Sequence, residues 1–144
     1  MLVVDDQLLL AVLSGIAPGE VTAGATRGEV FTTGSWYYRL GRAVTAGSGS
    51  GSLSGRFQAL AEPVRSRVQA SLEELPDEIG LLSLRVVVPV MQAFQLTRPT
   101  NFLTAEALGA ALLLDAEVAV TTDAPLLRAG CVELAIGYRV VAVP

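Results

Sequence analysis

The fold of this chain is decided by its opening stretch, VVDDQLLLAV at residues 3–12. Residues 2–5 form an apolar run closed by an acid and predict a short buried strand, and the leucine-rich run after it predicts a helix ending near Gly15. Glycine suits the left-handed position that follows many helices. Asp5 and Asp6 lie where this strand passes into the helix. Capping the helix needs only one of them, so the second acid requires another explanation.

The order of strand and then helix recurs along the chain. Further strands are predicted at residues 29–33, 81–84, 117–122 and 138–143. Further helices are predicted at 35–44, starting at Ser35, at 56–75, as two linked helices or one kinked helix, and at 88–96, 104–115 and 123–130. The strands are short and apolar without polar alternation, which indicates a parallel sheet covered on both faces. We therefore predict an α/β fold with three layers, α/β/α, around a mainly parallel central sheet.

Segments rich in glycine, proline or serine are predicted to connect these elements. They form a loop at 16–28 and a turn at 76–80. The segment TAGSGSGSLSG, at about 45–55, has the composition of a flexible linker. We interpret it as a mobile internal loop, with a connector of no function as the alternative. The 44 residues before it are too few for an independent domain, so residues 1–144 are predicted to form one domain.

Composition excludes several classes of chemistry. The chain has one cysteine, Cys131, and no histidine, and all ten of its basic residues are arginine. An internal disulfide, a histidine-dependent triad, a zinc site with histidine ligands and lysine chemistry are therefore excluded. The net charge of -4 repels nucleic acid except through a local arginine patch or bound metal ions.

The sequence also predicts a cytoplasmic protein that does not enter a membrane. Hydrophobic residues make up 51% of the chain, but no window reaches the ~18 uninterrupted apolar residues that a membrane span requires. The N-terminus lacks a basic lead and carries two acids, unlike a secretory signal peptide.

Several acids directly follow predicted strands, at the edge where an α/β sheet binds its ligands. Asp5 and Asp6 follow the first predicted strand, Asp123 follows the strand at 117–122, and ligands of such sheets bind beyond the carboxyl ends of the strands. Glu106 is the only charged residue between Arg98 and Asp115 and lies on a strongly apolar predicted helix, where a carboxylate is costly to bury unless it is paired or bound to a cation. Three separated acids of this kind predict a shared Mg²⁺ or Mn²⁺ ion.

Each of these acids also has a purely structural interpretation. Asp6 and Asp123 are each suited to be a helix N-cap, and Glu106 suits the first turn of a helix, where the helix dipole favours an acid. Two other groups are open to the same two interpretations. The first group is Trp36, Tyr37 and Tyr38, which are suited either to stack on bases or to pack in the core or an interface. The second is Arg56, Arg65 and Arg67, which are suited either to bind phosphate or to form a solvated helix face.

Two stretches resemble PIN domains. They are MLVVDDQLLLAVLSG at 1–15 and LTAEALGAALLLDAEVAVTTDAPLLRAG at 103–130. The resemblance implies the PIN fold and a metal-dependent ribonuclease, as in the toxins of bacterial toxin–antitoxin pairs. It makes Asp5 the first family acid, Glu106 approximately the third, displaced by about one position from the best ungapped register, and Asp123 the fourth.

The chain departs from the family pattern at two positions. Asp6 stands where the family usually has threonine or serine, and the second family acid, a glutamate on the second helix, is missing. Arg39 falls at or beside that position, which exchanges a negative charge for a positive one. An arginine within ~5 Å of the acids would oppose a divalent cation and neutralise the carboxylates.

Three hypotheses follow. In the first, Asp5, Glu106 and Asp123 hold Mg²⁺ or Mn²⁺ for RNA cleavage, with Asp6 replacing the missing ligand. In the second, the chain is a catalytically inactive PIN-like binding module in which Arg39 pairs with Asp5 or Glu106. The third is an unrelated α/β protein for a small ligand, although the first strand lacks the glycine motif of nucleotide binding. The resemblance implies RNA and a small antitoxin-like protein as partners, and the exposed-looking SWYY segment is compatible with a homodimer.

Overall fold

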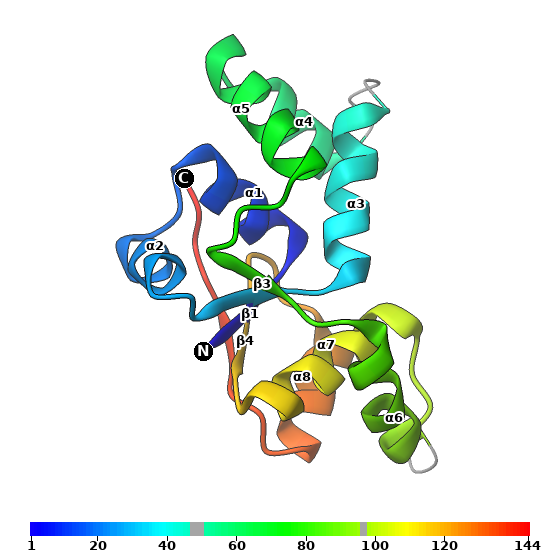
Figure 1. Cartoon of the computed structure of the whole chain (residues 1–144). Coiled ribbons are helices and arrows are strands. Elements are labelled where there is room, and N and C mark those ends of the chain that lie inside the picture. Colours follow the sequence, from blue (N-terminus) through cyan, green and yellow to red (C-terminus); the bar gives the residue numbers. More distant parts are fainter. Residues whose placement is uncertain (47–50, 96–97) are drawn as a thin grey trace.

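The computed structural model describes residues 1–46, 51–95 and 98–144 (Figure 1). In these residues, a sheet of parallel strands forms the centre of the molecule, with the strand order β3-β2-β1-β4-β5. The strands are β1 (Leu2–Val4), β2 (Val30–Thr32), β3 (Ile79–Leu81), β4 (Glu117–Val120) and β5 (Tyr138–Val140).

Helices surround this sheet. In the described part of the chain they are α1 (Asp6–Ser14), α2 (Gly19–Thr26), α3 (Gly34–Thr45), α4 (Ser52–Gln58), α5 (Glu62–Glu73), α6 (Leu84–Gln95), α7 (Phe102–Leu114) and α8 (Pro125–Glu133).

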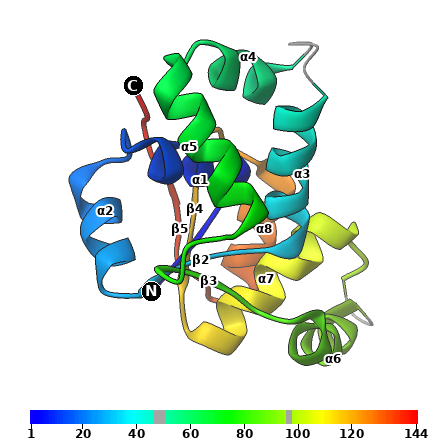
Figure 2. The same ribbon diagram turned by 45° about the horizontal axis from the view of Figure 1, so that its top comes forward.

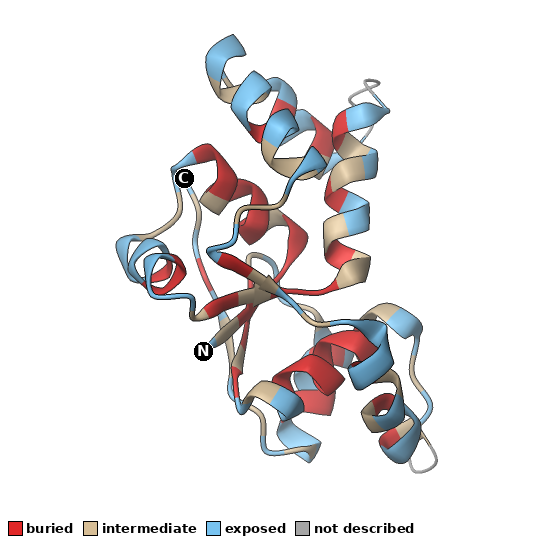
Figure 3. Ribbon diagram, in the orientation of Figure 1, coloured by how far each residue is buried: buried red, intermediate tan, exposed pale blue. Residues whose placement is uncertain are grey.

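The helices form two layers because alternate strand residues point to opposite faces of the sheet. Val4 of β1 and Ala119 of β4 belong to the cluster that packs with α1 to α5, whereas Val3 and Val118 belong to the cluster with α6, α7 and α8. Figures 1 and 2 show these two groups on opposite sides of the strands. Buried residues line the helix faces that turn toward the sheet (Figure 3). The predicted three-layer α/β fold with a parallel sheet is confirmed.

The strand order reverses beside β1. From β1 the chain passes to β2 and β3 on one side and then returns to β4 and β5 on the other. Val3 therefore pairs with Phe31 of β2 and with Val118 of β4. The carboxyl ends of β1 and β4 consequently lie next to each other, which brings the chain after Val4 close to the chain after Val120. This is the position at which α/β sheets bind ligands.

The first helix confirms its predicted end. Gly15 follows α1 in the left-handed conformation, with φ of 79°, and its N–H donates to the carbonyl of Val12. The start of α3 differs from the prediction, since the helix begins at Gly34. The side chain of Thr33 accepts the N–H of Trp36, so Thr33 rather than Ser35 is the capping residue.

The loop predicted at 16–28 is wrong, because it contains the helix α2. This helix has a narrow apolar face, formed by Val21 and Ala25, which are four residues apart and buried in the core. Its other positions are mostly glycine, alanine and threonine, so its composition resembles that of a loop. Burial of one face, rather than helix propensity, accounts for this element.

The third strand is displaced from its predicted place. β3 covers Ile79–Leu81, so it begins in the predicted turn at 76–80 and shares only Leu81 with the predicted strand at 81–84. The helix α6 already begins at Leu84, where the strand was predicted to end. The two alternatives for 56–75 are resolved as two linked helices, α4 and α5. Pro63 lies in the first turn of α5, where its missing N–H is not needed.

The predicted mobile loop at 45–55 is partly helical, because α4 begins at Ser52. The predicted loop residues 47–50, and residue 96 of the helix predicted at 88–96, lie outside the described residues. No single described helix is long and apolar enough to cross a membrane, and α1 and α2 pass that test only as a pair bent by 80°.

Candidate carboxylate site

A hollow of about 340 Å³ opens at the carboxyl ends of β1 and β4. The side chains that matter for its chemistry are Asp5, Asp6, Trp36, Arg39, Thr104 and Thr121. The structure therefore brings together two of the predicted acids and the predicted neutralising arginine. Glu106 and Asp123 do not line this hollow.

Asp5 is held in place by its neighbours. Its Oδ1 accepts the N–H of Leu8 at 2.8 Å, which caps α1, and its Oδ2 accepts the N–H of Thr121 at 2.8 Å and the hydroxyl of Thr121 at 3.1 Å. Burial raises the pKa of Asp5, against the opposing effect of these hydrogen bonds. Asp5 thus joins the start of α1 to the end of β4, and both of its oxygens are occupied.

Asp6 differs from Asp5 in having no hydrogen-bond partner for one oxygen. It is the first residue of α1 and is buried, and its Oδ2 lies 3.3 Å from Nε of Arg39 without hydrogen-bond geometry. Burial raises the pKa of Asp6, the positive charge of Arg39 lowers it, and the charge of Asp5 raises it. The prediction of Asp6 as the N-cap is wrong, because Asp5 is the cap. Arg39 pairs with Asp6, and not with Asp5 or Glu106 as expected.

Glu106 lies on α7 and is almost fully buried, with 1% of its surface exposed. Its Oε2 accepts the N–H of Gly34 at 3.0 Å and its Oε1 accepts the N–H of Ser35 at 2.8 Å, so it caps the start of α3. The prediction that Glu106 belongs to the first turn of its own helix is wrong, because α7 begins at Phe102 and its first turn holds no acid. Its negative charge instead faces the positive end of α3.

Asp123 lies at the edge of this region and faces other partners. Its Oδ2 accepts a hydrogen bond from Arg128 at 2.8 Å, and its Oδ1 accepts the hydroxyl of Tyr138 at 3.0 Å. Ala124, without a side-chain hydrogen bond, is the N-cap of α8, so the capping role predicted for Asp123 is wrong. The contact with Tyr138 ties the end of β4 to β5.

The donor set gives little room for a shared ion. Asp5, Glu106 and Asp123 each have both oxygens in hydrogen bonds, and Asp6 has one oxygen beside Arg39. Within the described ranges, no three acid or cysteine side chains lie close enough to hold one metal ion. In this arrangement the acids do not fit a shared divalent ion without moving. Their metal binding stays a prediction from the resemblance.

Comparison of the sequence with protein-family models and with curated proteins finds no match. The PIN-like character of the chain therefore also stays a prediction.

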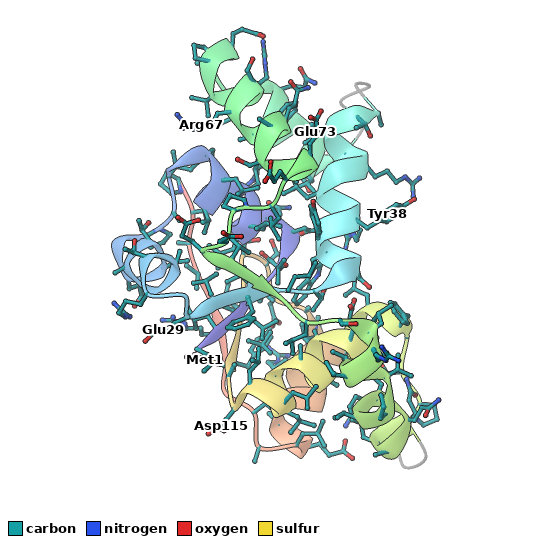
Figure 4. The ribbon with its side chains drawn as sticks, in the orientation of Figure 1. Met1, Glu29, Tyr38, Arg67, Glu73 and Asp115 are labelled. Atoms are coloured by element: carbon teal, nitrogen blue, oxygen red, sulfur yellow. The ribbon has the colours of Figure 1, made fainter. Side chains whose placement is uncertain are left out.

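The remaining candidates are divided between core and surface. Trp36 is buried in the core, the hydroxyl of Tyr37 donates to the carbonyl of Leu72, and Tyr38 projects from α3 with 69% of its surface exposed (Figure 4). Arg65 pairs with Glu62 of its own helix. Arg67 donates to the carbonyl of Ser14.

Sequence reasoning missed Thr121 and Tyr138, the two residues that hold Asp5 and Asp123. Thr121 carried one signal, because it lies near the end of the strand predicted at 117–122, beside the acids. Tyr138 carried no such signal, since its contact depends on the pairing of β4 with β5.

Proposed function

We propose that this chain is a PIN-like binding module in which Arg39 takes the place of a catalytic metal ion. The observation that carries the proposal is the 3.3 Å approach of Arg39 Nε to Asp6 Oδ2, inside the hollow that Asp5 also lines. A guanidinium supplies positive charge to the buried acids and opposes the approach of a divalent cation. A cytoplasmic location forms part of the proposal.

An exposed apolar surface supports a binding role. A second hollow, of about 330 Å³, lies beside the first and shares Arg39 with it. Its lining includes Tyr38, Leu84 and Phe102, whose surfaces are 69%, 44% and 52% exposed. Large apolar side chains gathered at one place on a surface are typical of protein interfaces. The partner in this proposal is a protein, either a second copy of the chain or a small antitoxin-like protein.

The second candidate function is the metal-dependent ribonuclease that the resemblance implies. One specific observation favours it, namely that Oδ2 of Asp6 is buried without a hydrogen-bond partner. A single free oxygen beside a guanidinium is a poor match for Mg²⁺, which requires six oxygen ligands in near-ideal geometry. We therefore rank this candidate below the binding module.

Calorimetric titration with Mn²⁺ separates the two. We expect no binding by the wild-type protein and none by Arg39→Gln, which removes the charge without adding a ligand. Arg39→Glu places a third carboxylate beside Asp5 and Asp6 and is expected to create a Mn²⁺ site, which the double variant Arg39→Glu with Asp6→Asn should lose. Wild-type binding that disappears in Asp5→Asn, together with RNA cleavage that disappears in the same variant, would overturn the proposal in favour of the nuclease.

A further inference from the structure

A positively charged hollow of about 320 Å³ lies between α3 and α4, outside the carboxylate site. Its charged lining residues are Arg39 and Arg42, and the other residues that line it are alanine, glycine, leucine and serine. Among the described residues that line it there is no carboxylate, although the whole chain has a net charge of -4. We infer that this hollow binds a phosphate group.

The phosphate site depends mainly on Arg42, because no acid of the described residues pairs with its positive charge. Arg39 and Arg42 are three residues apart on α3 and so lie on neighbouring positions of one helix face. Arg42 is exposed, and although its carbonyl accepts the Thr45 hydroxyl, its guanidinium group has no hydrogen-bond or ion-pair partner in the described part of the chain. Arg39 meets Asp6 through Nε, which leaves its two terminal nitrogens for a ligand. Paired guanidinium groups match the oxygens of a phosphate.

A hydroxyl group completes the donor set. Ser52 Oγ accepts a hydrogen bond from Nε2 of Gln7 at 3.1 Å, so its own proton is free to donate. The neighbouring Ser54 donates to the carbonyl of Ala43 at 3.1 Å and thereby holds α4 against α3. The hollow therefore has donors from both helices.

The small lining residues leave space for the ligand. Ala43, Ala46 and Gly51 form the parts of the wall between the polar groups. A phosphate group offers at least three oxygens in a tetrahedral arrangement, so the two guanidinium groups and the Ser52 hydroxyl can each bind a different oxygen from a different direction, whereas the two oxygens of a carboxylate lie in one plane. This is why we assign a phosphate group rather than an acidic side chain. The inference goes beyond the proposed function, since it does not depend on whether Asp5 and Asp6 bind metal.

The test compares three probes at about 50 mM salt, where phosphate contacts are strong. They are inorganic phosphate, a short single-stranded oligoribonucleotide with a 5′-phosphate, and the same oligoribonucleotide with a 5′-hydroxyl. Binding is measured with the wild-type protein, with Arg42→Gln and with Arg85→Gln. Arg85 of α6 is the matched control, because it is also exposed and has no ion-pair partner among the described residues, but does not line the hollow.

We expect Arg42→Gln to weaken binding about tenfold, as the loss of one charge-assisted hydrogen bond implies, while Arg85→Gln leaves it unchanged. If both oligoribonucleotides bind in a way that depends on Arg42, the ligand is a phosphodiester. If only the 5′-phosphorylated oligoribonucleotide binds in this way, the ligand is a phosphomonoester. If only inorganic phosphate does, the ligand is the free ion. Binding of none of the probes, or equal losses in both variants, would overturn the inference. Neither variant touches Asp5 or Asp6, so this failure is distinguishable from a failure of the Mn²⁺ titration.

Discussion

Glu106 of α7 and Ser35 of α3 are joined by a hydrogen bond of 2.8 Å, in which the buried carboxylate accepts the backbone N–H. The other oxygen of Glu106 accepts the N–H of Gly34, and the side chain of Thr33 accepts that of Trp36. Together they satisfy three of the N–H groups that the start of a helix leaves free. This cap fixes where α3 begins and so helps to place Arg39, one turn further on, beside Asp6.

Replacing Glu106 tests this role. Glu106→Ala leaves two partly buried N–H groups without acceptors, and we expect it to lower the free energy of unfolding by roughly 3 kcal/mol. Glu106→Gln keeps one acceptor and brings an NH₂ group against an N–H donor, with an expected loss of roughly 1 to 3 kcal/mol. Urea unfolding followed by circular dichroism measures both. Wild-type stability in both variants would contradict the capping role.

Asp5 and Asp123 are expected to differ in their effect on stability, although the resemblance gives both the same role. Asp5→Ala removes the cap of α1 and the acceptor of Thr121, with an expected loss of roughly 2 kcal/mol. Asp123→Asn disturbs only exposed contacts with Arg128 and Tyr138 and is expected to stay within about 0.5 kcal/mol of the wild type. Thermal or urea unfolding measures the difference, and equal losses would show that Asp123 has a structural role as well.

The fold class was predictable because its strongest signals are local. The apolar runs of β1 and α7 and the position of Gly15 depend on neighbours in the sequence. α2 was missed because only Val21 and Ala25 reveal its buried face, and β3 was displaced because Gly80 interrupts its short apolar run and gives it the composition of a turn. The location of these two elements is decided by what they pack against.

The candidate site was likewise predictable only where it depends on neighbours in the sequence. The meeting of Asp5 and Asp6 at a strand end followed from the order of elements, and Arg39 was expected nearby from the resemblance. The partner of each acid was not predictable, because Glu106 meets α3 and Asp123 meets β5 only after distant segments pack together.

Asp6 makes stability depend on pH. Because burial raises its pKa in the folded protein above the ordinary value, the folded state holds its proton to a higher pH than the unfolded state. The contribution of Asp6 to stability is therefore full at low pH and is lost as the pH rises through its folded pKa. We expect Asp6→Asn to be more stable than the wild type at pH 7, by an amount that shrinks as the pH approaches 3.8.

Urea unfolding of the wild type and Asp6→Asn across this pH range measures the effect. Asp77→Asn removes an exposed acid in the turn before β3 and controls for the change in net charge. A stability difference between the wild type and Asp6→Asn that does not change with pH, or that grows toward low pH, would show that Arg39 outweighs burial at this site.

Gly80 of β3 is fixed by the aromatic ring of its partner in the sheet. It pairs with Phe31 of β2, and a Cβ atom at this position would lie 2.2 Å from Cδ1 of Phe31. Gly80→Ala therefore requires the ring to move and is expected to destabilise the protein by roughly 1 to 3 kcal/mol. In a Phe31→Ala background the same substitution should cost much less stability, because the obstructing ring is absent.

Gly41→Ala in α3 is the control, because a Cβ atom there meets nothing within 4 Å, and it should stabilise the protein by about 0.5 to 1 kcal/mol. Equal effects of Gly80→Ala in both backgrounds would contradict the close packing of Phe31 on Gly80.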